Sequence, residues 1–146
     1  MPFRFSSANM RPMKDALLAM SAMYLVFTGF AFLLPVLVKN KEDYDIIKTY
    51  FFGGAARLPA GVAGFILALG LFFYPKGNVV FFSDLLPLAV LLADSLVLAM
   101  GRLRVSGTGD RLEKAGMILN NLQIPLGGIS LATGFLHGLA SGILFL

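Results

Sequence analysis

Four long apolar stretches, separated by short polar segments, constrain this chain more than any other feature of its sequence. They cover residues 15–38, 54–74, 85–101 and 124–146. A helix rises about 1.5 Å per residue, so about 17–25 apolar residues span the hydrocarbon core of a bilayer. Because every backbone group in lipid must find a hydrogen-bond partner within the protein, each stretch is predicted to be a helix. The sequence therefore predicts one all-α domain over residues 1–146, an integral membrane four-helix bundle.

The composition agrees with lipid as the solvent of the outer surface. Hydrophobic residues make up 58% of the chain and charged residues 14%, against about 45–50% and about 25% in a typical soluble domain. The twelve Lys and Arg residues lie in the N-terminal tail and near the ends of the apolar stretches, where such residues normally face anionic lipid. We therefore expect membrane lipid, and no nucleic acid, as a partner. The chain has no cysteine, which excludes disulfides and thiolate catalysis.

Two segments outside the simple four-helix pattern carry predictions of their own. In residues 39–52, which are dense in charge, Tyr44, Ile47 and Phe51 recur at helical spacing, so we expect a short helix in the plane of the membrane surface. The fourth helix is expected over residues 112–146, kinked or broken near Pro125 and the glycines that follow it. A boundary helix would then occupy residues 112–123 and precede the spanning segment.

Small residues recur every four positions in the second and fourth stretches. Such stripes let a neighbouring helix backbone approach closely. The stripe in the second stretch includes Ala60 and Gly64, and that in the fourth includes Ser130, Gly134, Gly138 and Gly142. We expect these residues to pack helix against helix.

Three polar side chains are predicted to share one layer deep in the bundle. Tyr24 lies ten residues after Lys14, Asp94 lies ten residues after Asp84, and His137 lies nine residues before the C-terminus, or about 14–15 Å along a helix from that side of the membrane. Gly64 falls at the same depth and would leave room beside them. One hypothesis is a buried Asp94–His137 pair, with the Tyr24 hydroxyl nearby, that binds the head of a hydrophobic ligand or relays a proton. The alternative, which we favour, is that these groups hydrogen-bond one another and lock the bundle.

Arg57, Arg102 and Arg104 are expected at one end of the bundle. They could clamp the phosphate or carboxylate of a head group. The favoured alternative is that they pair with acidic residues of the segment 39–52 and extend to lipid phosphates. No catalytic motif or metal-ligand cluster is visible in the sequence, and one histidine cannot supply both axial ligands of a haem. We expect no catalytic residues, no metal and no cofactor beyond a bound lipid or quinone.

The order Arg57, Gly61, Gly64, then Leu67-Ala68-Leu69-Gly70-Leu71-Phe72, and later Gly101-Arg102, resembles small bacterial DoxX-like four-helix membrane proteins. The resemblance covers the second and third apolar stretches. It implies a compact four-helix bundle with Arg57 and Arg102 as shared polar positions. We expect a multi-pass location in a membrane, the bacterial inner membrane.

Taken together, these features predict a small polytopic membrane protein. We expect a non-enzymatic structural or accessory subunit, whose partners are other subunits of a membrane complex or further copies of itself. The first alternative is a binding protein or enzyme for a hydrophobic small molecule, a quinone or lipid, that uses Tyr24, Asp94 and His137. The second alternative is a small transporter.

Overall fold

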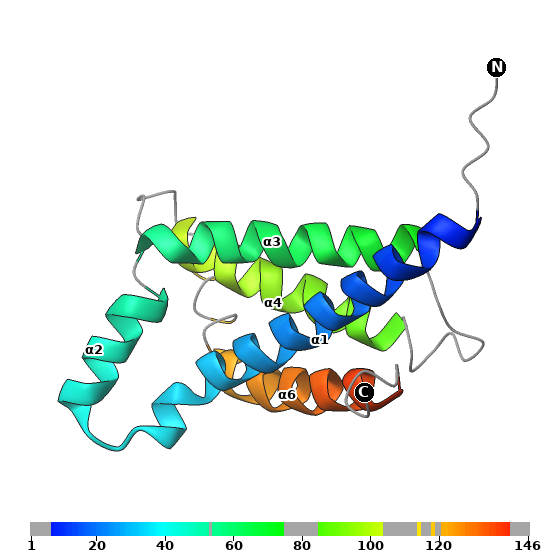
Figure 1. Cartoon of the computed structure of the whole chain (residues 1–146). Helices are drawn as coiled ribbons and strands as arrows, with labels where there is room; N and C mark the ends of the chain where they lie inside the picture. The colour runs from blue at the N-terminus through cyan, green and yellow to red at the C-terminus, as the bar shows by residue number, and fades with distance from the viewer. Residues whose placement is uncertain are drawn as a thin grey trace.

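The computed structural model describes residues 7–52, 54–74, 85–103, 114, 118 and 121–140, and the elements it forms there are all helices. The prediction of an all-α chain is therefore confirmed for this part of the sequence. The helices are α1 (Ser7–Leu37), α2 (Lys41–Phe52), α3 (Gly54–Phe73), α4 (Leu86–Leu103) and α6 (Gln123–Ala140), drawn in Figure 1. The segments 12–37 and 56–73 are long and apolar enough to cross a membrane, and 86–100 is apolar but shorter.

The helices pack as two close pairs, α1 with α6 and α3 with α4, and α4 joins the pairs through its contacts with α6. Figure 1 shows α2 leaving this bundle at one end. Both pairs are antiparallel. Gly29 of α1 meets Leu131 of α6, whereas the earlier Val26 meets the later Gly134. In the second pair Gly61 of α3 meets Ala99 of α4.

Glycines allow the two backbones of the α1–α6 pair to touch. A Cβ atom added at Gly29 would lie 2.7 Å from the backbone nitrogen of Leu131, and one at Gly127 would lie 3.0 Å from the carbonyl oxygen of Gly29. At Gly134 it would lie 2.9 Å from the backbone nitrogen of Val26. Since real Cβ atoms do not fit at such distances, any larger residue would push the helices apart.

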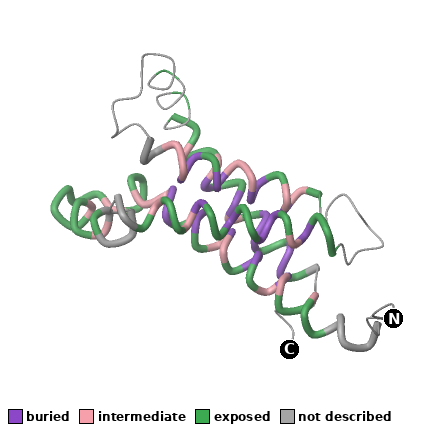
Figure 2. Tube along the Cα trace, turned by 90° about the horizontal axis from the view of Figure 1, so that it is seen from above, coloured by how far each residue is buried: buried purple, intermediate pink, exposed green. Residues whose placement is uncertain are grey.

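The described part of the bundle buries polar side chains within an apolar core and exposes large apolar side chains on its outside. Its apolar core includes Leu25, Phe32 and Leu91, but the buried set also contains seven polar or charged residues: Ser21, Thr28, Asp94, Ser95, Ser130, Thr133 and His137. On the outside, Met23 is 72% exposed and Phe73 is 68% exposed. Figure 2 shows the buried positions along the lines where the helices meet, with exposed positions on the outer faces.

The first helix begins at Ser7, eight residues before the predicted start at Asp15. The prediction located the start of the apolar stretch, but a helix can begin earlier, in polar sequence. Residues such as Ala8, Met10 and Arg11 have high helix propensity, and the helix continues through them into polar sequence.

The helix expected in residues 39–52 is present as α2. Asn40 caps it, since its carboxamide oxygen accepts a hydrogen bond from the Glu42 backbone N–H at 3.3 Å and its carbonyl accepts one from Tyr44 N–H at 3.0 Å. Glu42 and Asp43 in the first turn suit the positive end of the helix dipole.

The predicted break in the fourth helix lies at the start of α6. Pro125 is the third residue of that helix, in the first turn, where proline is tolerated. The backbone bond from Leu126 N–H to Leu122 O, at 2.9 Å, carries helical geometry across this point. Most of the expected boundary helix, residues 112–123, lies outside the described residues.

Candidate functional site

Asp94 lies where α1, α4 and α6 meet, and it is fully buried. Its two carboxyl oxygens bond to hydroxyls on the two neighbouring helices. Oδ2 forms a 2.7 Å hydrogen bond with Thr28 Oγ1 of α1, and Oδ1 forms a 2.8 Å hydrogen bond with Ser130 Oγ of α6. One side chain of α4 therefore ties three helices together.

Both hydroxyls that reach Asp94 also bond to their own helices. Thr28 Oγ1 lies 2.9 Å from the carbonyl oxygen of Tyr24 and 3.2 Å from that of Leu25. Ser130 Oγ lies 2.8 Å from the carbonyl oxygen of Leu126. These backbone bonds hold each hydroxyl oxygen at the position where it contacts the carboxyl group.

A second polar contact joins α1 and α6 at another level. Ser21 Oγ lies 3.3 Å from His137 Nε2 and donates to the carbonyl oxygen of Leu18 at 2.9 Å. Ser21 precedes Thr28 by seven residues and His137 follows Ser130 by seven, which separates the two levels by about 10 Å along the helices. The α1–α6 interface thus holds two polar levels, two helical turns apart.

Tyr24 lies between these levels on α1 and turns toward α3. Its hydroxyl donates to the carbonyl oxygen of Ala60 at 2.8 Å. The ring rests on Gly64, where an added Cβ would overlap the Tyr24 hydroxyl and Ser95 Oγ. The room that we expected beside Gly64 is therefore filled by the Tyr24 phenol.

The three residues of the predicted layer all lie within the bundle, with hydrogen-bond partners that differ from those we expected. Asp94 bonds to Thr28 and Ser130, His137 bonds to Ser21, and Tyr24 bonds to the backbone of α3. The sequence predicts Ser130 only as a helix-packing residue, and it does not identify Ser95. The signal for Ser130 was its place on the inner stripe of α6, seven residues before His137.

Arg57 lies half-buried in the first turn of α3, within electrostatic reach of Tyr44 on α2. Because α3 and α4 are antiparallel, Arg102 lies near the same end of the bundle. Arg104 and Gly142 lie outside the described residues. The predicted binding of a head group by these arginines stays a prediction.

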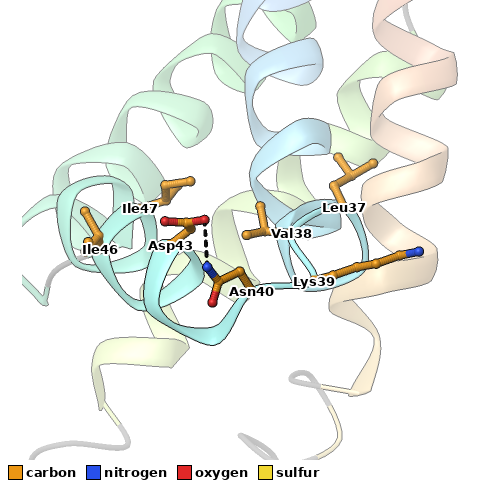
Figure 3. A pocket seen from close by; sticks show the side chains of 7 residues that line it. All are labelled: Leu37, Val38, Lys39, Asn40, Asp43, Ile46 and Ile47. Carbon is orange, nitrogen blue, oxygen red and sulfur yellow. Dashed lines mark hydrogen bonds between the residues drawn. The ribbon is translucent and has the colours of Figure 1, made fainter.

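Two hollows of the described structure lie away from the buried Asp94 and His137. A groove of about 480 Å³ runs along the outer side of the α1–α6 interface, lined by Ala19, Ala22, Met23, Val26, Phe27, Phe30, Gly134, Phe135 and Gly138. A second, of about 490 Å³, lies at the turn between α1 and α2 (Figure 3). There the carboxamide of Asn40 donates to Asp43 at 3.1 Å, beside exposed Ile46.

Within the described ranges, no three His, Asp or Glu side chains lie together as a metal site would require. The buried polar groups instead bond to hydroxyls and to helix carbonyls. Comparison with protein families, with curated proteins and with solved structures finds no match to this chain.

Proposed function

We propose that this chain is an integral membrane protein that acts by packing, as a non-enzymatic structural or accessory subunit of a membrane complex. An apolar outer surface around a core that also buries polar groups is the observation that carries the proposal. Large apolar side chains such as Met23 and Phe73 are exposed, while Asp94 and His137 are buried. Water would penalise the exposed surface, but hydrocarbon favours it.

The contacts of the buried polar groups support a role in packing. Thr28, Asp94 and Ser130 link three helices, and Ser21 with His137 links two. In hydrocarbon, hydrogen bonds of this kind hold helices together, at about 0.6–2 kcal/mol each. The close α1–α6 backbone contact at Gly29 and Gly127 adds dispersion energy to the same interface.

Two measurements test the proposal in order. Membranes from cells that make the protein are washed with alkaline carbonate, and we expect the chain to stay in the pellet until detergent is added. Release by carbonate would overturn the membrane assignment. Native mass spectrometry of the gently solubilised protein should then show other chains at fixed stoichiometry. A chain that stays alone at every detergent concentration would overturn the subunit role and leave the membrane assignment intact.

The groove between α1 and α6 favours a second candidate, a binding protein for a hydrophobic small molecule such as a quinone or lipid. Its volume of about 480 Å³ falls within the range of small-molecule sites, about 300–1,000 Å³. Its lining is apolar, so it suits an acyl or isoprenoid chain. Solvent extraction of the purified protein followed by mass spectrometry tests this function. One compound at constant stoichiometry supports it, and bulk lipid in membrane proportions contradicts it.

A further inference from the structure

The hydroxyl protons around Asp94 are too few for the contacts that the oxygens make. Thr28 Oγ1 has three oxygen neighbours, Asp94 Oδ2 at 2.7 Å and the carbonyl oxygens of Tyr24 and Leu25. Ser130 Oγ has two, Asp94 Oδ1 at 2.8 Å and Leu126 O at 2.8 Å. Each hydroxyl has a single proton to donate, and an ionised carboxylate and a carbonyl only accept. Two protons would then serve five short contacts.

A proton on the carboxyl group reduces the shortage, because three protons then serve the five contacts. With the proton on Oδ2, Asp94 donates to Thr28 Oγ1, and the Thr28 hydroxyl is free to donate to the carbonyl oxygen of Tyr24. The Ser130 hydroxyl then divides its proton between Asp94 Oδ1 and Leu126 O. Oδ2 is the preferred oxygen because Thr28 has two competing backbone acceptors and Ser130 has one.

The surroundings also favour a neutral carboxyl group. Asp94 is fully buried, and the described side chains that bond to it are uncharged hydroxyls. A buried carboxylate without a cationic partner is strongly disfavoured. The titratable groups that neighbouring helices bring nearest are Tyr24, four residues from Thr28, and His137, seven residues from Ser130. On α3, Arg57 lies three residues before Ala60, the partner of Tyr24.

We propose that Asp94 is a proton-binding site, with the proton held on Oδ2 while α1, α4 and α6 are packed around it. Release of this proton would leave a charge at the junction of three helices, so ionisation and packing oppose each other. The site thus couples the proton concentration to the contact of α4 with α1 and α6. This function goes beyond a passive role in packing, and it holds whether or not the chain has partner subunits.

Infrared spectroscopy of the purified protein in lipid vesicles near neutral pH tests the protonation state. We expect a carbonyl band of a protonated carboxylic acid that disappears in Asp94→Asn and persists in Asp43→Asn, which changes an exposed aspartate on α2. In Ser130→Ala the band should shift to higher wavenumber, because Oδ1 loses a hydrogen-bond donor. Absence of the band in the wild type, or a band that Ser130→Ala does not move, overturns the proposal.

Thermal unfolding in detergent as a function of pH tests the coupling. A packed state that binds the extra proton loses stability as the pH rises, since the unfolded state releases it more readily. The unfolding midpoint of the wild type should therefore fall from acidic to alkaline pH more steeply than that of Asp94→Asn. An asparagine offers one N–H donor toward Thr28 and one acceptor toward Ser130, as the neutral acid does. Parallel curves for the two proteins overturn the coupling.

Discussion

The phenol of Tyr24 lies directly on Gly64, so α1 and α3 fit together only because residue 64 has no side chain. A Cβ atom at this position would fall 2.6 Å from Tyr24 Cζ and closer still to the hydroxyl. The same glycine gives the Tyr24 hydroxyl access to the carbonyl oxygen of Ala60. Close approach and hydrogen bonding at this point are therefore two results of one missing methyl group.

Replacing Gly64 by alanine should lower the free energy of unfolding by about 1–3 kcal/mol, the usual range for overpacking. Helix propensity alone would act in the opposite direction, by about 1 kcal/mol. Gly128→Ala is the matched control, because a Cβ there meets nothing within 4 Å. Thermal unfolding of the purified protein in detergent measures both variants. Equal midpoints for the two would contradict the packing of Tyr24 on Gly64.

Tyr24→Phe removes the hydrogen bond to Ala60 and keeps the ring. We expect a loss of about 0.5–1.5 kcal/mol, as for other hydrogen bonds between membrane helices. Tyr74→Phe, at a position that is 40% exposed, should change the stability by less than the error of the measurement. Chemical unfolding in mixed micelles gives both values. A Tyr24→Phe protein as stable as the wild type would show that this bond does not hold α1 to α3.

Ser21 and His137 should be energetically coupled, because their side chains meet across the α1–α6 interface. A double-mutant cycle with Ser21→Ala and His137→Ala should give an interaction energy of about 0.5–1.5 kcal/mol. The control cycle pairs His137→Ala with Ser95→Ala, since Ser95 Oγ donates to Leu91 O of its own helix at 2.6 Å. That cycle should be additive, and equal coupling in both would argue against a specific contact.

Lysine on the outer face of α3 should interfere with membrane insertion. Ile66 is 61% exposed near the middle of the predicted span, so Ile66→Lys should cost about 2.5–3.5 kcal/mol of insertion free energy. Ile46, 57% exposed on α2 outside the predicted spans, is the matched control. The share of carbonate-resistant protein measures the effect. A reduction of the same size in Ile46→Lys would mean that α3 does not face lipid.

The helices and some of their contact points could be predicted, because both follow from the spacing of apolar and small residues in the sequence. The spacing of small residues indicated Gly64 and Gly134 as contact points, and both lie against neighbouring helices. The partners of Asp94 could not be predicted in this way. Counting residues gives depth along a helix, whereas a hydrogen bond also depends on rotation about the helix axis. The packing of α4 against α1 and α6 sets that rotation. It depends on tertiary contacts and therefore cannot be derived from the spacing of residues within one helix.

The ends of the helices could not be predicted accurately either. Apolarity marks where a segment prefers hydrocarbon, so it missed the polar first turns of α1 from Ser7. Pro125 indicated a break and lies in the first turn of α6. A proline in a sequence does not tell which of its two neighbouring segments it belongs to, because it is tolerated at the start of a helix and excluded from its interior.

Helices α1 and α6 pack closely together, yet among the described helices they are the first and the last to be synthesised. Ser21 and His137 are separated by 116 positions along the chain. In the membrane protein that we propose, α1 is therefore made and inserted before the partner of Ser21 on α6 and the partner of Thr28 on α4 exist. Throughout that interval these hydroxyls satisfy only their own helix carbonyls. A nascent chain that stalls before α6 presents an incomplete polar face to lipid, which is a feature that membrane proteases and chaperones could recognise.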